Sequence, residues 1–560
     1  MFHKSVLPVR WLIVAVLAAL AWFSPRLGDP LGAIERLAAC FAARKRAVVV
    51  SIALAAILTR LALLYIMPVP VPAIHDEFSY LLAADTFAHG RLANPPHPMW
   101  IFFDTFHVLP HPTYASMFPP AQGGVLALGQ LLGHPWIGVL LSMAVMCAVV
   151  AWALQGWLPP QWALLGAVLV LLKIHLFGYW LESYWGGAVA AIGGALVVGA
   201  LPRIIRHQRV RDAILMGIGA SLLANSRPFE GLIFCIPVAV SLLVWLLSER
   251  SPVLSITGWR VLFPLLGILA FTLVFMGYYN WRVTGNALLV PHALYMREYI
   301  NYPVFVWQKA APPLKYANPQ FDSFFNIWVR DHYSPSWQLA WKACVTGRRF
   351  FLGSPLRTLF VTLPWLVKDR RTRLLLVQLL VSAVGLLLVV YFNPHYAAPL
   401  TATVFILLIQ GMRHLWQWKV KGRRVGVFLT RLVILLAVAN GVILGGETVR
   451  NRVAEWNTHR AQIIRQLEGT SGSHLVLVRY APDHDVLHEW VYNAADIDHA
   501  KIVWAREIPG LDLKPLLDYF RGRRVWLVEA DTVPVQLQPY QPPGTSSGNP
   551  SPVVVPAAAQ

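Results

Sequence analysis

The sequence predicts an α-helical polytopic membrane protein with a small C-terminal α/β module. Of its 560 residues, 57% are hydrophobic and 13% are charged, whereas soluble domains carry about 25% charged residues. Apolar runs of roughly 17–20 residues, long enough to cross a bilayer, recur as far as residue 445. Basic residues gather in the short loops between these runs, as the positive-inside rule describes. Together these features predict about 11–12 transmembrane helices.

The basic clusters orient the spans. They begin at Arg44, Arg203, Lys368 and Arg413. An even number of spans separates each pair, so all four clusters lie on one side, which the rule assigns to the cytoplasm. The long loops 67–133 and 280–348 and all residues after 445 then face outward. The spans are predicted at 48–66, 134–153, 161–177, 185–201, 211–225, 230–247, 260–279, 349–366, 373–391, 396–412 and 426–445.

Four regions follow from this pattern. Residues 1–47 contain an apolar segment from Val9 to Phe23, which predicts an extra span or a membrane-surface helix. Cleavage as a signal peptide is disfavoured, because it would leave the first basic cluster facing outward. Residues 48–445 form the transmembrane core. Residues 446–533 alternate strand and helix signals, which predicts an α/β module, and the Pro-, Gly- and Ser-rich tail 534–560 predicts disorder.

The module's strands are predicted at 474–479, 501–504 and 524–529, with a helix at 514–520. The net charge of +20 does not indicate nucleic-acid binding, because the basic residues follow the membrane topology. The four cysteines form no CxxC pair and lie outside the module, which argues against a disulfide framework or a cysteine zinc site.

Two adjacent carboxylates, Asp76 and Glu77, open the first outer loop. Their mutual repulsion and partial burial could raise one pKa and create a general base. The alternative is structural, since acids also cap and stabilise the first turn of a helix, here one predicted from Glu77 to His89.

The same loop continues with polar residues in an aromatic setting. Asp104, His107 and Tyr114 stand among Trp and Phe residues, which suits a sugar ring and equally suits an interfacial aromatic belt. His75, His107 and His111 are candidate ligands for a divalent metal, but they show no fixed ligand spacing.

Further polar residues mark the outer ends of later spans. Glu182 lies in a short turn close to the hydrocarbon edge, where a charge is either paired or functional. Arg227 could form an ion pair with Glu230, or its guanidinium could hold a lipid-linked phosphate. Other candidate donors to an anionic headgroup are His292, Arg297, His395 and Tyr396, each of which could instead be a capping or snorkelling residue.

A first outer loop that opens with Asp-Glu just after a span resembles the GT-C glycosyltransferases, the class of the protein O-mannosyltransferases and the aminoarabinose lipid A transferase. The stretches NWRVTGN at 280–286 and NPHYAAP at 393–399 resemble later loops of the bacterial branch. The resemblance covers roughly 48–445, as expected for a membrane-spanning core. His75 and the stretch 107–111 depart from the family pattern.

The resemblance implies a polyprenyl-phosphate sugar as donor, an acceptor hydroxyl on a protein, lipid or glycan, and an inverting transfer at the periplasmic face of a bacterial inner membrane. Asp76 would be the base, with Glu77 and Asp104 as neighbouring or acceptor-binding acids. His107, Tyr114 and Glu182 would contact sugar or acceptor. The leaving phosphate would be stabilised by Arg227, Arg297 or His395, with His292 and Tyr396 nearby. No cofactor is required, and a divalent metal stays open.

Two other functions remain open from the residues alone. A transporter or flippase of lipid-linked sugars would need polar groups at mid-membrane and often paired repeats. A non-catalytic envelope scaffold would leave the acids and histidines of the outer loops unexplained. The clustering of carboxylates on the outer side favours the enzyme.

Overall fold

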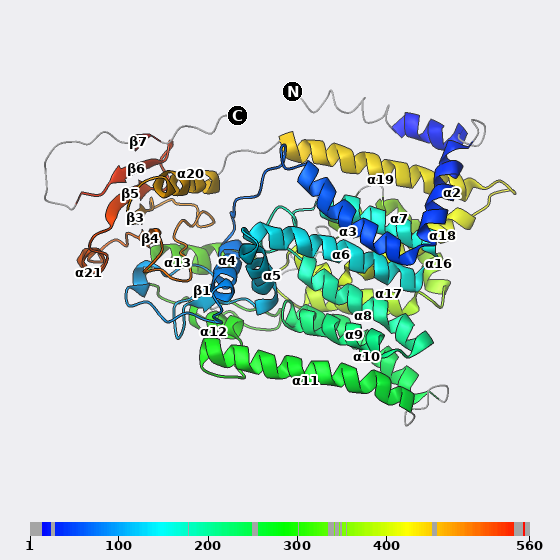
Figure 1. The fold of residues 1–560 in the computed structure, drawn as a ribbon, viewed down its shortest axis with the longest axis horizontal. Helices are drawn as coiled ribbons and strands as arrows, with labels where there is room; N and C mark the ends of the chain where they lie inside the picture. Colours follow the sequence, from blue (N-terminus) through cyan, green and yellow to red (C-terminus); the bar gives the residue numbers. More distant parts are fainter. Residues whose placement is uncertain are drawn as a thin grey trace.

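The computed structural model describes residues 14–23, 29–176, 178–248, 256–300, 302–333, 341, 347, 350–353, 356–450, 456–541 and 553–554. Within these residues, six helical segments are long and apolar enough to cross a membrane. They are α6 (Pro135–Trp157), α8 (Ala188–His207), α10 (Pro228–Leu247), α11 (Ile256–Thr284), the turn Pro394–Leu400 with α18 (Thr401–Gln417), and α19 (Val425–Arg450). The protein is thus a helical, multi-pass membrane protein (Figure 1).

Shorter helices occupy most of the other predicted spans. They are α3 (Lys45–Ala62), α7 (Pro160–Val170) with its π-helical extension Leu171–Leu176, α9 (Val210–Ala224), α16 (Leu363–Lys368) and α17 (Arg373–Leu387). The predicted span at 349–366 is only partly described, and its described part is interrupted by a 3-10 segment, Thr358–Thr362. Of the segment Val9–Phe23, residues 14–23 are helical. The helix α2 (Pro30–Ala42) follows, and Arg431 of α19 pairs with Glu35 at 2.8 Å.

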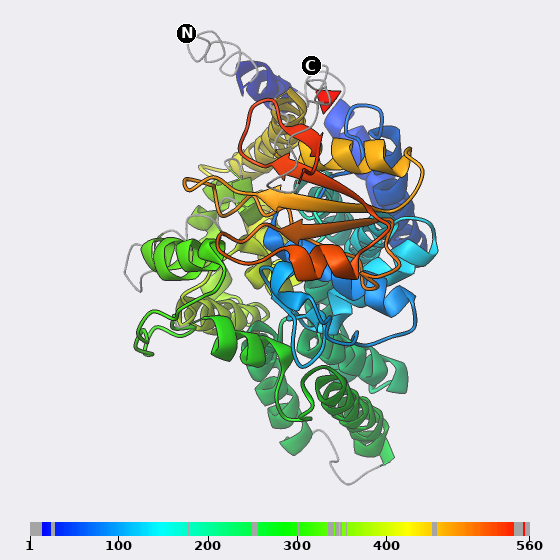
Figure 2. The same cartoon turned by 90° about the vertical axis from the view of Figure 1, so that its left-hand side faces the viewer.

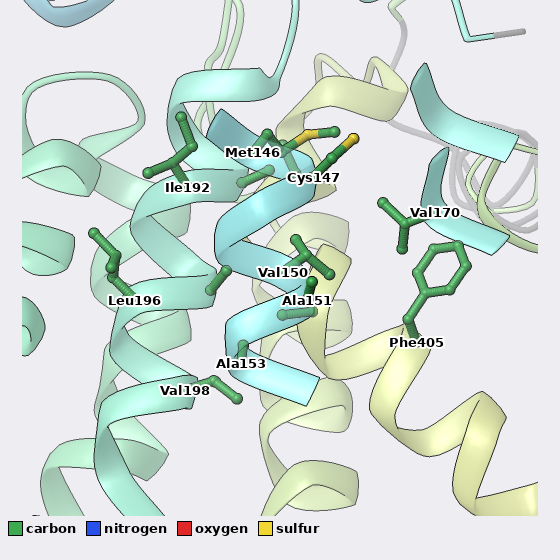
Figure 3. Packing of buried hydrophobic residues seen from close by; sticks show 14 of the residues in the cluster. Met146, Cys147, Val150, Ala151, Ala153, Val170, Ile192, Leu196, Val198 and Phe405 are labelled. Carbon is green, nitrogen blue, oxygen red and sulfur yellow. The ribbon is translucent and has the colours of Figure 1, made fainter. Parts of the chain in front are cut away.

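Small residues place α8 at the centre of the bundle. A side chain at Gly194 would come within 2.0 Å of the Pro399 carbonyl, and one at Gly193 within 2.9 Å of the Gly219 carbonyl. Without a hydrophobic force between helices in lipid, such close backbone approach supplies packing contacts. Figure 3 shows the resulting core, in which Val150 of α6 and Leu196 of α8 lie among other apolar side chains.

The outer loops form a layer of short elements at one end of the bundle. The first loop holds α4 (His75–Ala88), a short hairpin of β1 (Val108–Leu109) and β2 (Ala115–Ser116), and α5 (Pro120–Leu131). The later loop holds α12 (Pro291–Tyr299), α13 (Pro319–Phe321) and α14 (Val329–His332). The prediction of a helix near Glu77–His89 is therefore confirmed, two residues earlier than expected.

The C-terminal module is a mixed sheet in the order β4-β3-β5-β6-β7. The strands β3 (His474–Arg479), β4 (Ile502–Arg506) and β5 (Arg524–Glu529) are parallel. The strand β6 (Gln536–Pro539) pairs antiparallel with β5, and β7 (Val553–Val554) pairs antiparallel with β6. Helices α20 (Trp456–Glu468) and α21 (Lys514–Tyr519) complete it. The predicted strands and helix are confirmed. The expectation of disorder from 534 onward is wrong for 536–539, which pair with β5 through backbone hydrogen bonds.

The module sits on the outer loops. Figures 1 and 2 show its sheet at the end of the bundle where α4 and α12 lie. Phe78 of α4 stacks on Tyr492 with ring centroids 4.1 Å apart, and the Ala495 amide donates to Asp85 at 2.7 Å. Elsewhere in the bundle the first two basic regions both contact the C-terminal end of α6, since Gln155 donates to the Lys45 carbonyl at 3.0 Å and Arg206 to the Gly156 carbonyl at 3.1 Å.

Candidate active site

A cavity of about 900 Å³ lies between the outer ends of the spans and the outer loops. We call it the chamber. Its walls are mainly apolar and aromatic, with a few polar side chains turned inward, as in pockets for amphipathic ligands. Its polar lining includes Asp76, His107, Arg227, Glu230 and His292. The chamber is large enough for a sugar headgroup and the start of a lipid chain.

The carboxylate of Asp76 lies in the first turn of α4 and faces the chamber. Oδ1 of Asp76 is 2.7 Å from Nδ1 of His107, a close contact without the geometry of a hydrogen bond. The N-terminus of α4 adds partial positive charge beside the carboxylate. These contacts hold Asp76 in one orientation, with its carboxylate toward the chamber.

The backbone of His107 is held in the left-handed region, with φ at 61°. This conformation is strained for a non-glycine residue. The His107 amide donates to the Tyr295 hydroxyl at 2.8 Å, and its carbonyl accepts from the Ser79 hydroxyl at 2.6 Å. Three segments of the outer layer therefore cooperate to aim one imidazole at Asp76.

Glu77 has a different environment from its neighbour. Its carboxylate accepts the backbone N–H groups of Ala73 at 2.8 Å, Ile74 at 3.0 Å and Tyr184 at 2.8 Å. The side chain is buried, and burial raises the pKa of Glu77 to about 7 against the opposing effect of these donors. Glu77 does not line the chamber. The predicted catalytic role for Glu77 is therefore corrected to a structural one, the capping of α4.

Arg227 lies at the start of α10 and lines the chamber. Its guanidinium lies 4.3 Å from the centre of the Tyr396 ring, and no ion pair within 4.0 Å joins it to Glu230 in the described part of the chain. Asp76, Tyr80 and Glu230 lie within its electrostatic reach. A guanidinium fixed by an aromatic face keeps N–H donors for a phosphate. The structure thus places Arg227, Tyr396 and Asp76 around one space.

His292 lines the chamber, and burial lowers its pKa to about 4. His395 is buried behind Tyr396 and does not line the chamber; its Nδ1 contacts the Tyr179 hydroxyl at 2.8 Å. At ordinary pH His292 is neutral, so it can contribute a hydrogen bond and not a charge. His395 positions the turn that carries Tyr396.

The candidate metal ligands do not converge. His75 is buried against Phe106, with stacked rings 4.3 Å apart, and the ring of His107 is 5.8 Å from it. His111 lies against Trp100 and does not line the chamber. Among the described residues, no group of three or more His, Cys, Asp or Glu side chains is placed to hold a metal ion.

Asp104 and Tyr114 lie beneath the module instead of in the chamber. The Tyr299 hydroxyl donates to Asp104 at 3.1 Å, and burial raises the pKa of Asp104 to about 7. The Tyr114 hydroxyl donates to the Asn493 carbonyl of the module at 3.3 Å. Their predicted contact with sugar or acceptor is therefore corrected, because both residues contribute to module docking.

A buried ion pair completes this docking site. Arg506 pairs with Glu489, and each side chain is 1% exposed. Arg506 also donates to the Asp104 carbonyl at 2.6 Å. Such a pair is costly to break, because a buried charge would lose its partner. The pair thereby fixes the segment that ends at Glu489, whose Leu487 and His488 line the chamber.

Glu182 and Arg297 are also placed away from the chamber lining. Glu182 pairs with the buried Arg60 of α3 at 2.9 Å, so its charge is engaged in holding the turn before α8 to α3. The Arg297 side chain is exposed on α12. The predictions that Glu182 binds acceptor and Arg297 binds phosphate are corrected by these positions.

Sequence reasoning missed the contribution of the module. Trp456, Leu487 and His488 line the chamber, and the Trp456 and His488 rings are 5.7 Å apart. Tyr333 and Tyr391 line another part of the wall. The aromatic richness of these segments is visible in the sequence, but nothing in their local pattern indicates contact with a loop hundreds of residues earlier.

Comparisons with known proteins found solved structures but no sequence relative. No protein-family model and no curated protein matches the chain. ArnT from Cupriavidus metallidurans bound to undecaprenyl phosphate is similar at 12% identity and a TM-score of 0.45, over 86% of this chain and 92% of that one. An Archaeoglobus fulgidus oligosaccharyltransferase, tethered with an acceptor peptide, is similar at 9% identity and a TM-score of 0.46, over 77% of this chain.

The chain spans 61% of the length of that oligosaccharyltransferase. What the geometry establishes is a multi-pass helical membrane protein whose outer loops and C-terminal module enclose the acids Asp76 and Glu230, the guanidinium of Arg227 and an aromatic wall.

Proposed function

We propose that this protein is a membrane glycosyltransferase that moves a hexosyl or pentosyl unit from a polyprenyl-phosphate donor to an acceptor hydroxyl, with inversion. The reaction takes place at the periplasmic face of a bacterial inner membrane. The observation that carries the proposal is that Asp76 and Arg227 line the same chamber, within electrostatic reach of each other. One group can accept a proton while the other receives developing negative charge.

The reaction needs one displacement. The acceptor hydroxyl gives its proton to Asp76, and its oxygen forms a bond to the anomeric carbon of the sugar. The bond from that carbon to the phosphate oxygen breaks, and the polyprenyl phosphate leaves with the electron pair. Arg227 stabilises the charge that develops on the phosphate. Because the acceptor attacks opposite to the leaving group, one displacement inverts the anomeric centre.

The chamber walls suit the two ends of such a donor. Phe229, Met276 and Phe305 line the part near the spans and offer an apolar surface to the first prenyl units. Trp456, Leu487 and His488 line the part formed by the module, on the aqueous side. An acceptor from the aqueous side would meet the module first. The ring of His107 aligns Asp76 between these two ends.

The test compares the two arginines that the sequence analysis assigned to the leaving phosphate. Wild type, Arg227→Gln and Arg297→Gln are purified in nanodiscs and given radiolabelled polyprenyl-phosphate sugars with native membrane extract as acceptor. Wild type and Arg297→Gln are expected to transfer label from the carrier. Arg227→Gln is expected to lose about a hundredfold or more, the order seen when one transition-state charge donor is removed. Equal transfer by both variants would refute the role of Arg227.

A further inference from the structure

A second cavity, of about 470 Å³, lies at the other end of α18. It is lined by Lys368 at the end of α16, Asp369 and Arg371 in the following turn, and Gln410, Arg413 and His414 of α18. We call it the basic cavity. Arg413 lies 17 positions after Tyr396 of the chamber wall, which is a distance of about 25 Å along the helix axis at 1.5 Å per residue. The two sites therefore lie near opposite faces of the bilayer, whose hydrocarbon core is about 30 Å thick.

The carboxylate in the basic cavity is already engaged. Asp369 accepts from the Gln410 amide at 2.7 Å, from His414 Nε2 at 3.2 Å and from the Arg371 backbone N–H at 2.9 Å. These bonds fasten the α16–α17 turn to α18. One carboxylate cannot neutralise the three permanent cations that share the cavity, Lys368, Arg371 and Arg413.

The guanidinium groups are arranged for an added anion. Arg413 donates through Nη1 to the Gln410 side-chain carbonyl at 2.6 Å, which fixes its orientation. Arg371 lies close enough to Arg413 for the two cations to repel each other. In the part of the chain that the structure describes, the side chains of Lys368 and Arg371 have no carboxylate partner. An anion between them would relieve the repulsion and accept several charge-assisted hydrogen bonds.

The surroundings point to a lipid phosphate. Trp365 lines the basic cavity, and its ring lies 6.1 Å from that of Trp418. Tryptophans gather at membrane–water interfaces, where phospholipid headgroups lie. Basic pockets between membrane helices bind anionic headgroups by the same combination of charge and interfacial position. We infer that the basic cavity binds the phosphate of an anionic phospholipid in the leaflet opposite the chamber.

This inference is independent of the proposed transfer reaction, and it can be tested without a donor. The protein is purified, stripped of lipid in detergent and titrated with phosphatidylglycerol or phosphatidylcholine, with binding followed by native mass spectrometry. The test variant is Arg371→Gln/Arg413→Gln. The matched control is Arg423→Gln/Arg424→Gln, which removes the same charge from the exposed loop between α18 and α19. Thermal unfolding of each protein reports whether it is folded.

We expect wild type and the control variant to bind phosphatidylglycerol more tightly than phosphatidylcholine. The test variant is expected to bind phosphatidylglycerol about tenfold or more weakly than wild type, the loss expected for one or two charge-assisted hydrogen bonds. If the double variant does not fold, Lys368→Gln, with its exposed side chain, replaces it. Equal weakening by test and control variants, or equal binding of both lipids, would overturn the inference. Protection from unfolding by inorganic phosphate without any lipid binding would overturn the lipid assignment and leave a soluble phosphate ester as the ligand.

Discussion

His107 Nδ1 lies 2.7 Å from Asp76 Oδ1, although helix α4 and the long segment that follows it separate the two residues in the first outer loop. The contact depends on a strained backbone at His107 that Tyr295 and Ser79 hold in place. Strain of this kind persists only where the surrounding structure over-determines it. The pair is therefore a built feature of the chamber, and it assigns different roles to its members. In the proposed reaction Asp76 faces the reacting groups, and His107 positions it.

Replacing His107 with Asn tests the contribution of the imidazole ring while the backbone conformation is kept. Asn tolerates the left-handed conformation better than most residues, so the variant is expected to fold like wild type. Loss of the positioning contact is expected to lower transfer about tenfold, for an interaction of about 1.4 kcal/mol. The effect should fall on kcat, with donor KM unchanged. A rise in KM alone would show that His107 binds donor instead of orienting Asp76.

Replacing Glu77 with Ala tests its structural role. Three backbone N–H groups would lose their acceptor, which is expected to cost about 1–3 kcal/mol of stability. Thermal unfolding in detergent should show the loss, while the protein that remains folded keeps its affinity for the donor. Wild-type stability combined with complete loss of transfer would instead return Glu77 to the catalytic machinery.

The stability of the docked module is expected to depend on pH through Asp104. Its native pKa of about 7 lies above the unfolded value of about 3.9, so between these values the native state binds more protons. Stability therefore falls as pH rises from about 4 to 7. The Asp104→Asn variant should show a flatter dependence of stability on pH. At pH 8 it should unfold at a higher temperature than wild type. An unchanged pH profile in the variant would contradict the assignment.

Removing one partner of the buried pair should loosen the module. Arg506→Met leaves the Glu489 charge buried without its partner, which is expected to cost about 3–5 kcal/mol. Hydrogen exchange in β3 and β4 should quicken. The double variant Arg506→Met/Glu489→Gln carries no orphaned charge and should recover much of the protection. If both variants exchange equally, the pair contributes through packing and not through charge.

The membrane core and the module could be predicted from the sequence because local residue patterns determine both. A span must supply enough consecutive apolar residues to cross the hydrocarbon, so the bounds of α6, α10 and α19 lie close to the predicted ones. The parallel strands of the module are short β-branched runs. The strand β6 was missed because its residues carry no such run and are ordered by pairing with β5.

The candidate site was predicted only in part, and for a geometric reason. Adjacent helical residues point about 100° apart, so one of Asp76 and Glu77 had to face the chamber and the other the protein. Which one does so depends on how α4 sits against the Tyr184 loop. Arg227 and Arg297 are both arginines, and the predicted topology places both on the outer side of the membrane. Only the fold places one beside Tyr396 and the other on an exposed face.

The central claim is that Asp76 is the base of a sugar transfer, and one measurement tests it most directly. Wild type, Asp76→Asn and, as control, Asp483→Asn on an exposed part of the module are reconstituted in nanodiscs with radiolabelled polyprenyl-phosphate sugars and native membrane extract. We predict that wild type and Asp483→Asn release label from the carrier onto acceptor and that Asp76→Asn, equally folded, does not. Transfer at the wild-type rate by Asp76→Asn would contradict the claim.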